Sequence, residues 1–171
     1  MVGSGALVTL PKQALDVLKA ARGPLFAVLD AAQGEKVWKF LGKSFGPRNS
    51  LYEGPKAKEL AEVSPYLLEL AGKSRRLERL VEQGWSQNWG IFLTSSRPFA
   101  DVRRQLRKHL MVQEEETKKR PYFRFYDPRV LRVFLPTCTP DQSEQFYGCI
   151  DAFYTEGKEG DLLHFPKPKA R

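Results

Sequence analysis

The residues best suited to chemistry in this chain lie in one short segment. Arg124, Tyr126, Asp127 and Arg129 supply two guanidinium groups, a phenol and a carboxylate close together. If the segment ends a strand, it occupies the place where α/β proteins often bind ligands. The set therefore has two interpretations, a small hydrolase that uses Asp127 with Tyr126 and Arg129, or a surface that binds a partner.

The residues before Asp127 have the pattern of a strand. Phe123 and Phe125 alternate with polar residues, which is the two-residue period of a strand that buries one face. A strand over residues 122–126 is therefore predicted, with Arg124 and Tyr126 on the same face. Tyr126 is more simply a buried ring with a hydrogen-bond partner than an acid or base.

The residues from Asp127 onward have the pattern of two short helices. Asp127 suits an N-cap and Pro128 the first helical position, and the apolar spacing continues to Pro136. Thr139 likewise suits the N-cap of a second helix, and Gln142 stands where it can close a capping box. A helix cap paired with a neighbouring arginine is thus the simpler role for Asp127.

Signatures of the common enzyme classes are missing from the sequence. It has no glycine-rich phosphate loop, no GxSxG elbow and no motif of paired carboxylates. The only histidines, His109 and His164, are far apart, and Cys138 and Cys149 flank a predicted helix. No metal site and no cofactor are expected, and both cysteines are interpreted as reduced, half-buried thiols.

The charge balance is strongly basic but spread along the chain. The net charge of +8 suits a nucleic-acid partner, an acidic protein partner or solubility alone. A helix predicted from Pro98 carries apolar residues on one face. Its other face is basic and consists of Arg103, Arg104, Arg107 and Lys108. Such a face is usually only solvated.

Short apolar runs alternate with helical segments along the chain. Strands are expected at 25–29, 49–53, 64–70, 89–94 and 149–154, and helices before Gly23, at 35–41, around 57–61, and after Ser74, Pro98, Asp127 and Thr139. The continuous apolar run at 25–29 suits a strand covered on both faces. The alternation predicts an α/β fold with a mixed, mostly parallel sheet flanked by helices in a single layered domain.

The chain divides into an N-terminal helix at 1–24, a core domain at 25–155 and a basic, proline-containing tail at 156–171. Its first residues lack the basic segment and apolar core of a secretory signal, and no apolar run approaches the length of a membrane span. A cytoplasmic location without a membrane partner is expected. Trp85 and Trp89, which flank glycines, either line an anchor pocket or pack in the core, and the core is favoured.

Five segments together resemble the adaptor chaperones of bacterial type VI secretion, whose domain was first described only as one of unknown function. They are FAVLDAA at 26–32, LAEVSPYLLEL at 60–70, GWSQNWGIFLTSS at 84–96, FADVRRQLRKHLMV at 99–112 and FRFYDPRVLRVFLPTCTPDQ at 123–142. The last segment is the most distinctive, and the similarity spans roughly residues 25–155. Many family members have a further helical lobe after the last strand, whereas this sequence ends within about twenty residues of Tyr154.

The resemblance implies a non-enzymatic adaptor that binds a secreted effector, often through the N-terminal region of the effector, and delivers it to the VgrG spike. Its signature positions here are Trp89, Gly90, Arg124, Tyr126, Asp127, Pro128 and Arg129. They either contact partners or hold the fold. We expect a partner-binding region around Arg124–Arg129, with Trp89, and on the basic face through Arg104 and Arg107.

Two rival functions belong to other classes. A nucleic-acid-binding module is suggested by the basic charge and by the aromatic segment at 122–126, because aromatic strands interleaved with arginine can stack bases. This rival is disfavoured because Phe123 and Phe125 are expected to be buried. The second rival, a hydrolase that uses Asp127, lacks an evident nucleophile and base.

Overall fold

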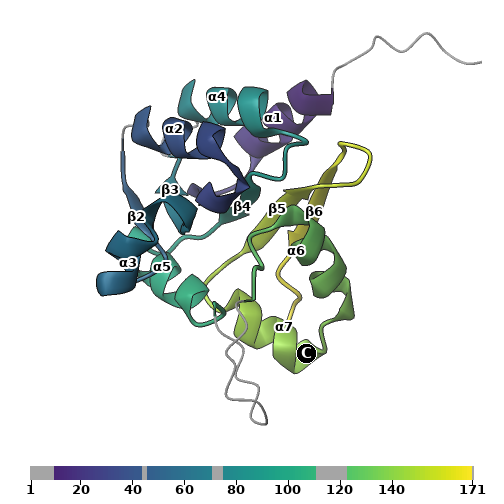
Figure 1. The fold of residues 1–171 in the computed structure, drawn as a ribbon. Helices are drawn as coiled ribbons and strands as arrows, with labels where there is room; N and C mark the ends of the chain where they lie inside the picture. The colour runs from purple at the N-terminus through teal and green to yellow at the C-terminus, as the bar shows by residue number, and fades with distance from the viewer. Residues whose placement is uncertain (1–9, 44–45, 71–74, 111–122, 171) are drawn as a thin grey trace, which may run out of the picture.

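The structure is a computed structural model, and it describes residues 10–43, 46–70, 75–110 and 123–170. A six-stranded sheet with the order β2-β3-β1-β4-β5-β6 runs through its middle (Figure 1). Its strands are β1 (Leu25–Asp30), β2 (Arg48–Ser50), β3 (Pro65–Glu69), β4 (Gly90–Thr94), β5 (Ala152–Glu156) and β6 (Leu162–Pro166).

Every neighbouring pair in this sheet is antiparallel, so the prediction of a mostly parallel sheet is wrong. The helical connection from β3 to β4 does join two strands that run the same way. However, β1 lies between them and is antiparallel to both. The connection from β1 to β2 is likewise split by β3. The alternation of strands and helices correctly indicated crossovers but could not show which strand occupies the gap.

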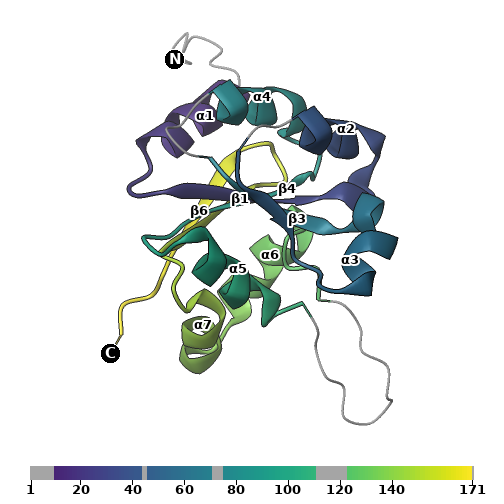
Figure 2. The same cartoon turned by 90° about the vertical axis from the view of Figure 1, so that its left-hand side faces the viewer.

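Helices cover both faces of the sheet (Figure 2). One layer consists of α1 (Leu10–Ala20), α2 (Glu35–Lys43) and α4 (Arg75–Gly84), and the other of α5 (Phe99–Arg107), α6 (Pro128–Phe134) and α7 (Pro140–Tyr147). The helix α3 (Pro55–Glu59) and the 3-10 turn η2 (Ala61–Val63) connect β2 to β3, and the 3-10 turns η1 (Ala31–Gln33) and η4 (Leu135–Thr137) follow β1 and α6. None of these helices combines the length and apolar character needed to cross a bilayer.

The central strand β1 is buried along its whole length, as its continuous apolar run predicted. Its side chains alternate between two hydrophobic cores, one on each face of the sheet. Leu25, Ala27 and Leu29 face the core under α1, α2 and α4, while Phe26 and Val28 face the core over α5, α6 and α7. Two cores of this extent stabilise the layers without metals or disulfides.

The two predicted helix starts near the candidate site are confirmed. The Asp127 carboxylate accepts from the N–H of Arg129 at the start of α6. Thr139 and Gln142 form the expected capping box at the start of α7. Each cap satisfies backbone donors that a helix end leaves without partners.

Residues 156–171, expected to be a tail without a strand, contain β6. A tight turn leads into it, in which the N–H of Gly157 donates to Asp161 O at 2.7 Å and Gly160 has a φ of 79°. The side chains of β6 are only half-buried or exposed. Because the strand buries little apolar surface and is followed by lysines and a proline, its local pattern did not distinguish it from a tail.

Candidate functional site

The segment before Asp127 forms a turn and not the predicted strand. The N–H of Asp127 donates to Arg124 O at 3.0 Å and closes this turn. Phe125, Tyr126 and Asp127 are buried one after another, which a strand with one covered face does not allow. The strand predicted from the two-residue alternation is therefore wrong, and Arg124 and Tyr126 differ in burial, since Arg124 is half-exposed and Tyr126 is buried. Tyr122, the first residue of the predicted strand, lies outside the described residues.

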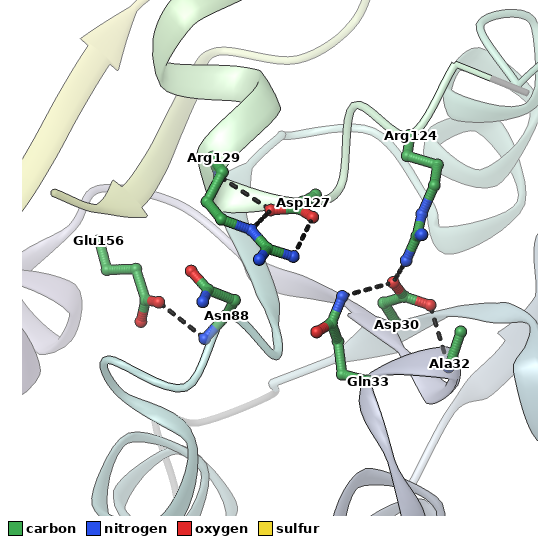
Figure 3. Close-up of polar contacts among 8 residues, drawn as sticks. All are labelled: Asp30, Ala32, Gln33, Asn88, Arg124, Asp127, Arg129 and Glu156. Atoms are coloured by element: carbon green, nitrogen blue, oxygen red, sulfur yellow. Dashed lines mark hydrogen bonds and ion pairs between the residues drawn. The ribbon is translucent and has the colours of Figure 1, made fainter. Parts of the chain in front are cut away.

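Asp127 is held by Arg129 as well as by the helix cap. The Arg129 guanidinium donates from Nε to Asp127 Oδ1 at 3.0 Å and from Nη2 to Oδ2 at 2.8 Å (Figure 3). The side chain of Asp127 is 8% exposed, whereas that of Arg129 is 53% exposed. Burial alone would raise the pKa of Asp127, but the hydrogen bonds from Arg129 lower it below its usual value.

Arg124 makes a second pair of the same kind with Asp30, at the end of β1. Nη2 of Arg124 donates to Asp30 Oδ2, which also accepts from Gln33 Nε2 at 3.1 Å. The other carboxylate oxygen accepts from the N–H of Ala32 at 3.0 Å and caps η1. Asp30 is 1% exposed and Arg124 is 44% exposed. Sequence reasoning missed Asp30 because it lies far from Arg124 in the chain.

The two pairs share one arrangement, in which a buried carboxylate holds a half-exposed guanidinium group (Figure 3). Both carboxylates already accept several hydrogen bonds, which suits holding a charge in place better than taking a proton from a substrate. Each guanidinium keeps N–H donors that its carboxylate does not use, and each side chain remains about half exposed. The arrangement can therefore offer two fixed cationic groups to an anionic surface.

Asp127→Asn is expected to lower the free energy of unfolding by about 1 kcal/mol at pH 7, because asparagine keeps the cap but loses the ion pair. The pKa of Asp127 is lowered in the folded state from 3.8, so its contribution is present above that value and is lost as pH falls through the folded pKa. Urea unfolding at several pH values should show that the difference in unfolding free energy between the parent and Asp127→Asn narrows below about pH 4. Asp127→Ala should lower the free energy of unfolding further, because alanine also removes the helix cap, and this additional loss should persist at low pH. A gap that stays constant with pH would contradict the ion-pair argument.

Tyr126 and Trp89, both expected at the partner surface, are buried. Tyr126 is 3% exposed, and burial raises the pKa of its phenol well above the usual value. Trp89 is 6% exposed, lies against Gly84 and contacts Phe40 edge-on at a ring-centroid distance of 5.8 Å. The core interpretation of Trp89 is therefore confirmed, and neither side chain is presented at the surface.

The basic face of α5 divides into linked and exposed residues. Arg107 donates to Leu51 O and pairs with Glu53 at 3.0 Å. Arg103 contacts the same segment, so these two residues attach α5 to the loop after β2. Arg104 is different, because its side chain is 72% exposed and, within the described ranges, pairs only with Asp101, at 3.2 Å. Of the two residues expected to contact a partner on this face, Arg104 is the one presented to solvent.

Comparison with known proteins gives a family for this fold and site. Residues 25–145 match the model of a family described as a domain of unknown function, DUF4123. The chain belongs to the DUF4123 family. The matched residues run from β1 to α7 and include both arginine–aspartate pairs. No curated protein and no solved structure shows significant similarity to the chain.

A further polar site in this DUF4123 protein was missed from the sequence. Glu156, at the end of β5, is 5% exposed and accepts from the N–H groups of Ser86 at 2.5 Å and Asn88 at 2.8 Å. Ser86 and Asn88 both have a positive φ, 63° and 56° respectively. Burial is the largest influence on Glu156 and raises its pKa. Asn88 is a residue type that tolerates this conformation, which is the only local signal of the site.

The Glu156 carboxylate also lines a small cavity beside the tryptophans. Its volume is about 10 Å³, which is room for one water molecule and not for a substrate. Trp85, Trp89 and Phe92 supply much of its apolar lining. In the described part of the chain, no three His, Cys, Asp or Glu side chains gather in a way that could hold a metal ion. The half-buried cysteines are both free, as expected.

Proposed function

We propose that this DUF4123 protein is a cytoplasmic, non-enzymatic adaptor that binds a type VI secretion effector and promotes the loading of that effector onto the VgrG spike. Membership of the family over residues 25–145 supports the proposal, since this span contains the motifs that resemble those of type VI adaptors. The segment at 123–142 is the most distinctive of these motifs.

The observation that carries a binding role is the pair of cations held by buried carboxylates. Asp30 and Asp127 hold the guanidinium groups of Arg124 and Arg129 in place, and each guanidinium remains about half exposed. Holding a side chain before binding lowers the entropy that a complex must lose. Fixed positive charge also steers an acidic partner and sets its orientation. This geometry supports recognition of an acidic surface on the effector.

The residues proposed to contact the effector are fewer than those expected from the sequence. Arg124, Arg129 and Arg104 present charge to solvent and can touch the effector directly. Tyr126, Asp127, Trp89 and Arg107 are buried or tied to the chain, and we assign them to holding the fold. Charge reversal at Arg107 would therefore disturb the link between α5 and the loop after β2, and Arg104 is the cleaner position for such a test.

The rival functions have less support. Of the aromatic residues that were to stack bases, Phe125 and Tyr126 are almost fully buried in the core. Hydrolysis through Asp127 would require a carboxylate that is free to move a proton, whereas this one is occupied by Arg129 and by the cap of α6. A binding role uses both arginine–aspartate pairs as they stand.

The proposal is tested by purifying the tagged protein together with the toxin encoded beside its gene and with the VgrG spike protein. A stable complex with the toxin is expected, and the spike should retain the toxin only when the adaptor is present. Arg104→Glu should weaken the toxin complex several-fold, because it reverses a charge that is 72% exposed.

The matched control is Arg79→Glu, the same charge change at an exposed residue of α4 on the opposite face of the sheet. It should bind the toxin as the parent does. Failure of the parent protein to bind the toxin would contradict the proposed function. Equal binding by Arg104→Glu and the parent would remove only the α5 contact.

A further inference from the structure

The strand β6 leaves one edge of the sheet open. It is the last strand in the sheet order and, among the residues that the structure describes, pairs on one side only, with β5. At the two ends of this ladder, Lys167 N–H donates to Asp151 O at 2.8 Å and Gly157 N–H to Asp161 O at 2.7 Å. Alternation along an antiparallel ladder then directs the backbone groups of Leu163 and Phe165 toward β5.

By the same alternation, the backbone N–H and C=O groups of Leu162 and His164 and the C=O of Pro166 point away from the sheet. The side chains of His164 and Pro166 are exposed and that of Leu162 is half-buried. An edge of this kind offers a template for one more strand. It lies outside residues 25–145, so it is not part of the matched family domain.

Apolar side chains of α1 lie beside this edge. Leu10 is 42% exposed and Val17 is 43% exposed, and they are two helical turns apart on one face of α1. Leu10 lies next to the β5–β6 turn, since a Cβ added at Gly160 would be 3.2 Å from its Cδ1. Lys19, on another side of α1, pairs with Glu78 of α4. The face with Leu10 and Val17 is thus left uncovered by the described part of the chain.

We propose that the open edge of β6 binds an extended segment of the effector, which adds a strand to the sheet and places apolar side chains at alternate positions against Leu10 and Val17. This inference rests on the proposed function, because it names the kind of segment that the adaptor recognises. Strand addition gives affinity through backbone hydrogen bonds and specificity through alternate side chains.

Pro166 makes a second copy of this chain a poor occupant of the full length of the edge. If two β6 strands paired about a two-fold axis at His164, each Leu162 carbonyl would face the Pro166 of the other copy, which has no N–H. Both Leu162 carbonyls would then lack a donor. A strand from another protein can supply an N–H opposite each of the outward carbonyls, including that of Pro166, so a heterologous segment is the better fit.

Charge at one end of the edge further defines the segment. Lys167 and Lys169 follow β6 and are exposed, and neither forms an ion pair within the described ranges. An acidic residue of the effector at that end would be stabilised by both lysines. The expected ligand is therefore an extended segment with alternating apolar residues and an acidic end.

The first test compares His164→Pro with His164→Thr in co-purification and titration with the toxin encoded beside the gene. Proline removes the outward N–H of His164 but keeps the bonds to β5, since proline is tolerated at edge positions whose N–H faces solvent. Threonine keeps the N–H and removes only the ring that stacks on Tyr154. His164→Pro should weaken binding by about tenfold or more and His164→Thr by less than about threefold.

A second pair of variants keeps the inference testable if His164→Pro does not fold. Leu10→Asp with Val17→Asp places two negative charges on the apolar face of α1, and Lys12→Asp makes the same change in net charge at an exposed position on another side of the same helix. The double variant should weaken toxin binding and Lys12→Asp should not. Hydrogen exchange should show the amides of Leu162 and His164 unprotected in the free protein and protected in the complex.

Unchanged toxin binding by both His164→Pro and the α1 double variant would overturn the inference while leaving the adaptor function intact. Protection of the Leu162 and His164 amides before the toxin is added would also overturn it, because the edge would then be covered by the chain itself. Absence of toxin binding by the parent protein is the separate outcome that contradicts the proposed function.

Discussion

Gly90→Ala is expected to prevent folding or to lower the free energy of unfolding by more than about 4 kcal/mol. Gly90 begins β4 and lies opposite Leu29 of β1, in the middle of the sheet. A Cβ at this position would lie 1.9 Å from Val28 O and 2.8 Å from Val28 C. These atoms belong to the backbone of the central strand, so neither side-chain rotation nor a small local shift can make room. Circular dichroism and urea unfolding measure the effect.

The matched control for this prediction is Gly42→Ala in α2. Gly42 is exposed, and a Cβ there would have no atom within 4 Å. Alanine in a helix is more stable than glycine by about 1 kcal/mol, so this variant should be slightly more stable than the parent. The same chemical change should therefore act in opposite directions at the two positions. A stable, fully folded Gly90→Ala protein would contradict the pairing of β4 with β1.

Sequence patterns correctly predicted the helix starts and the strand that depend on residues close together in the chain. The starts of α6 and α7 follow from Asp127-Pro128 and Thr139-Pro140, since cap and first turn depend on residues a few positions apart. The buried strand β1 follows from its uninterrupted apolar run. The strand predicted at 122–126 was wrong because its alternation rested on only two phenylalanines, and tertiary packing placed a turn at residues 124–127 instead.

The sheet order and most of the site depend on residues far apart in the chain. Arg124 meets Asp30, and Glu156 meets Ser86 and Asn88, across separations that no local pattern records. The arginines were therefore found from sequence, whereas the buried carboxylate of Asp30 and the whole Glu156 site were not. A buried acidic residue at a strand end has the same local appearance as an exposed one until its donors are known.

Glu156→Ala is expected to lower the free energy of unfolding by about 2 kcal/mol or more, because two backbone donors in strained conformations lose their shared acceptor. The carboxylate links the end of β5 to the loop that carries Trp85 and Trp89, and it lines the cavity beside both rings. Release of that loop should change tryptophan emission in the folded protein. Urea unfolding followed by fluorescence and by circular dichroism measures both effects.

Glu156→Gln separates the charge from the hydrogen bonds. The amide keeps one acceptor oxygen, so Glu156→Gln should lower the free energy of unfolding less than Glu156→Ala does. The groups that face Glu156 include Arg132, whose charge lowers its pKa, and Asp127, whose charge raises it, while burial has the largest influence. The folded pKa lies above the usual 4.5, so the ionised carboxylate costs stability at neutral pH.

That cost has a defined pH dependence. The folded state takes up a proton at Glu156 before the unfolded state does, so the parent should gain stability relative to Glu156→Gln as pH falls from 7 through the folded pKa of Glu156 toward 4.5. This pH dependence has the opposite sign to that expected for Asp127→Asn, because there the parent loses its advantage in unfolding free energy as pH falls, and does so only at lower pH. A parent that loses stability relative to Glu156→Gln on acidification would show that the donors of Ser86 and Asn88 outweigh burial at this carboxylate.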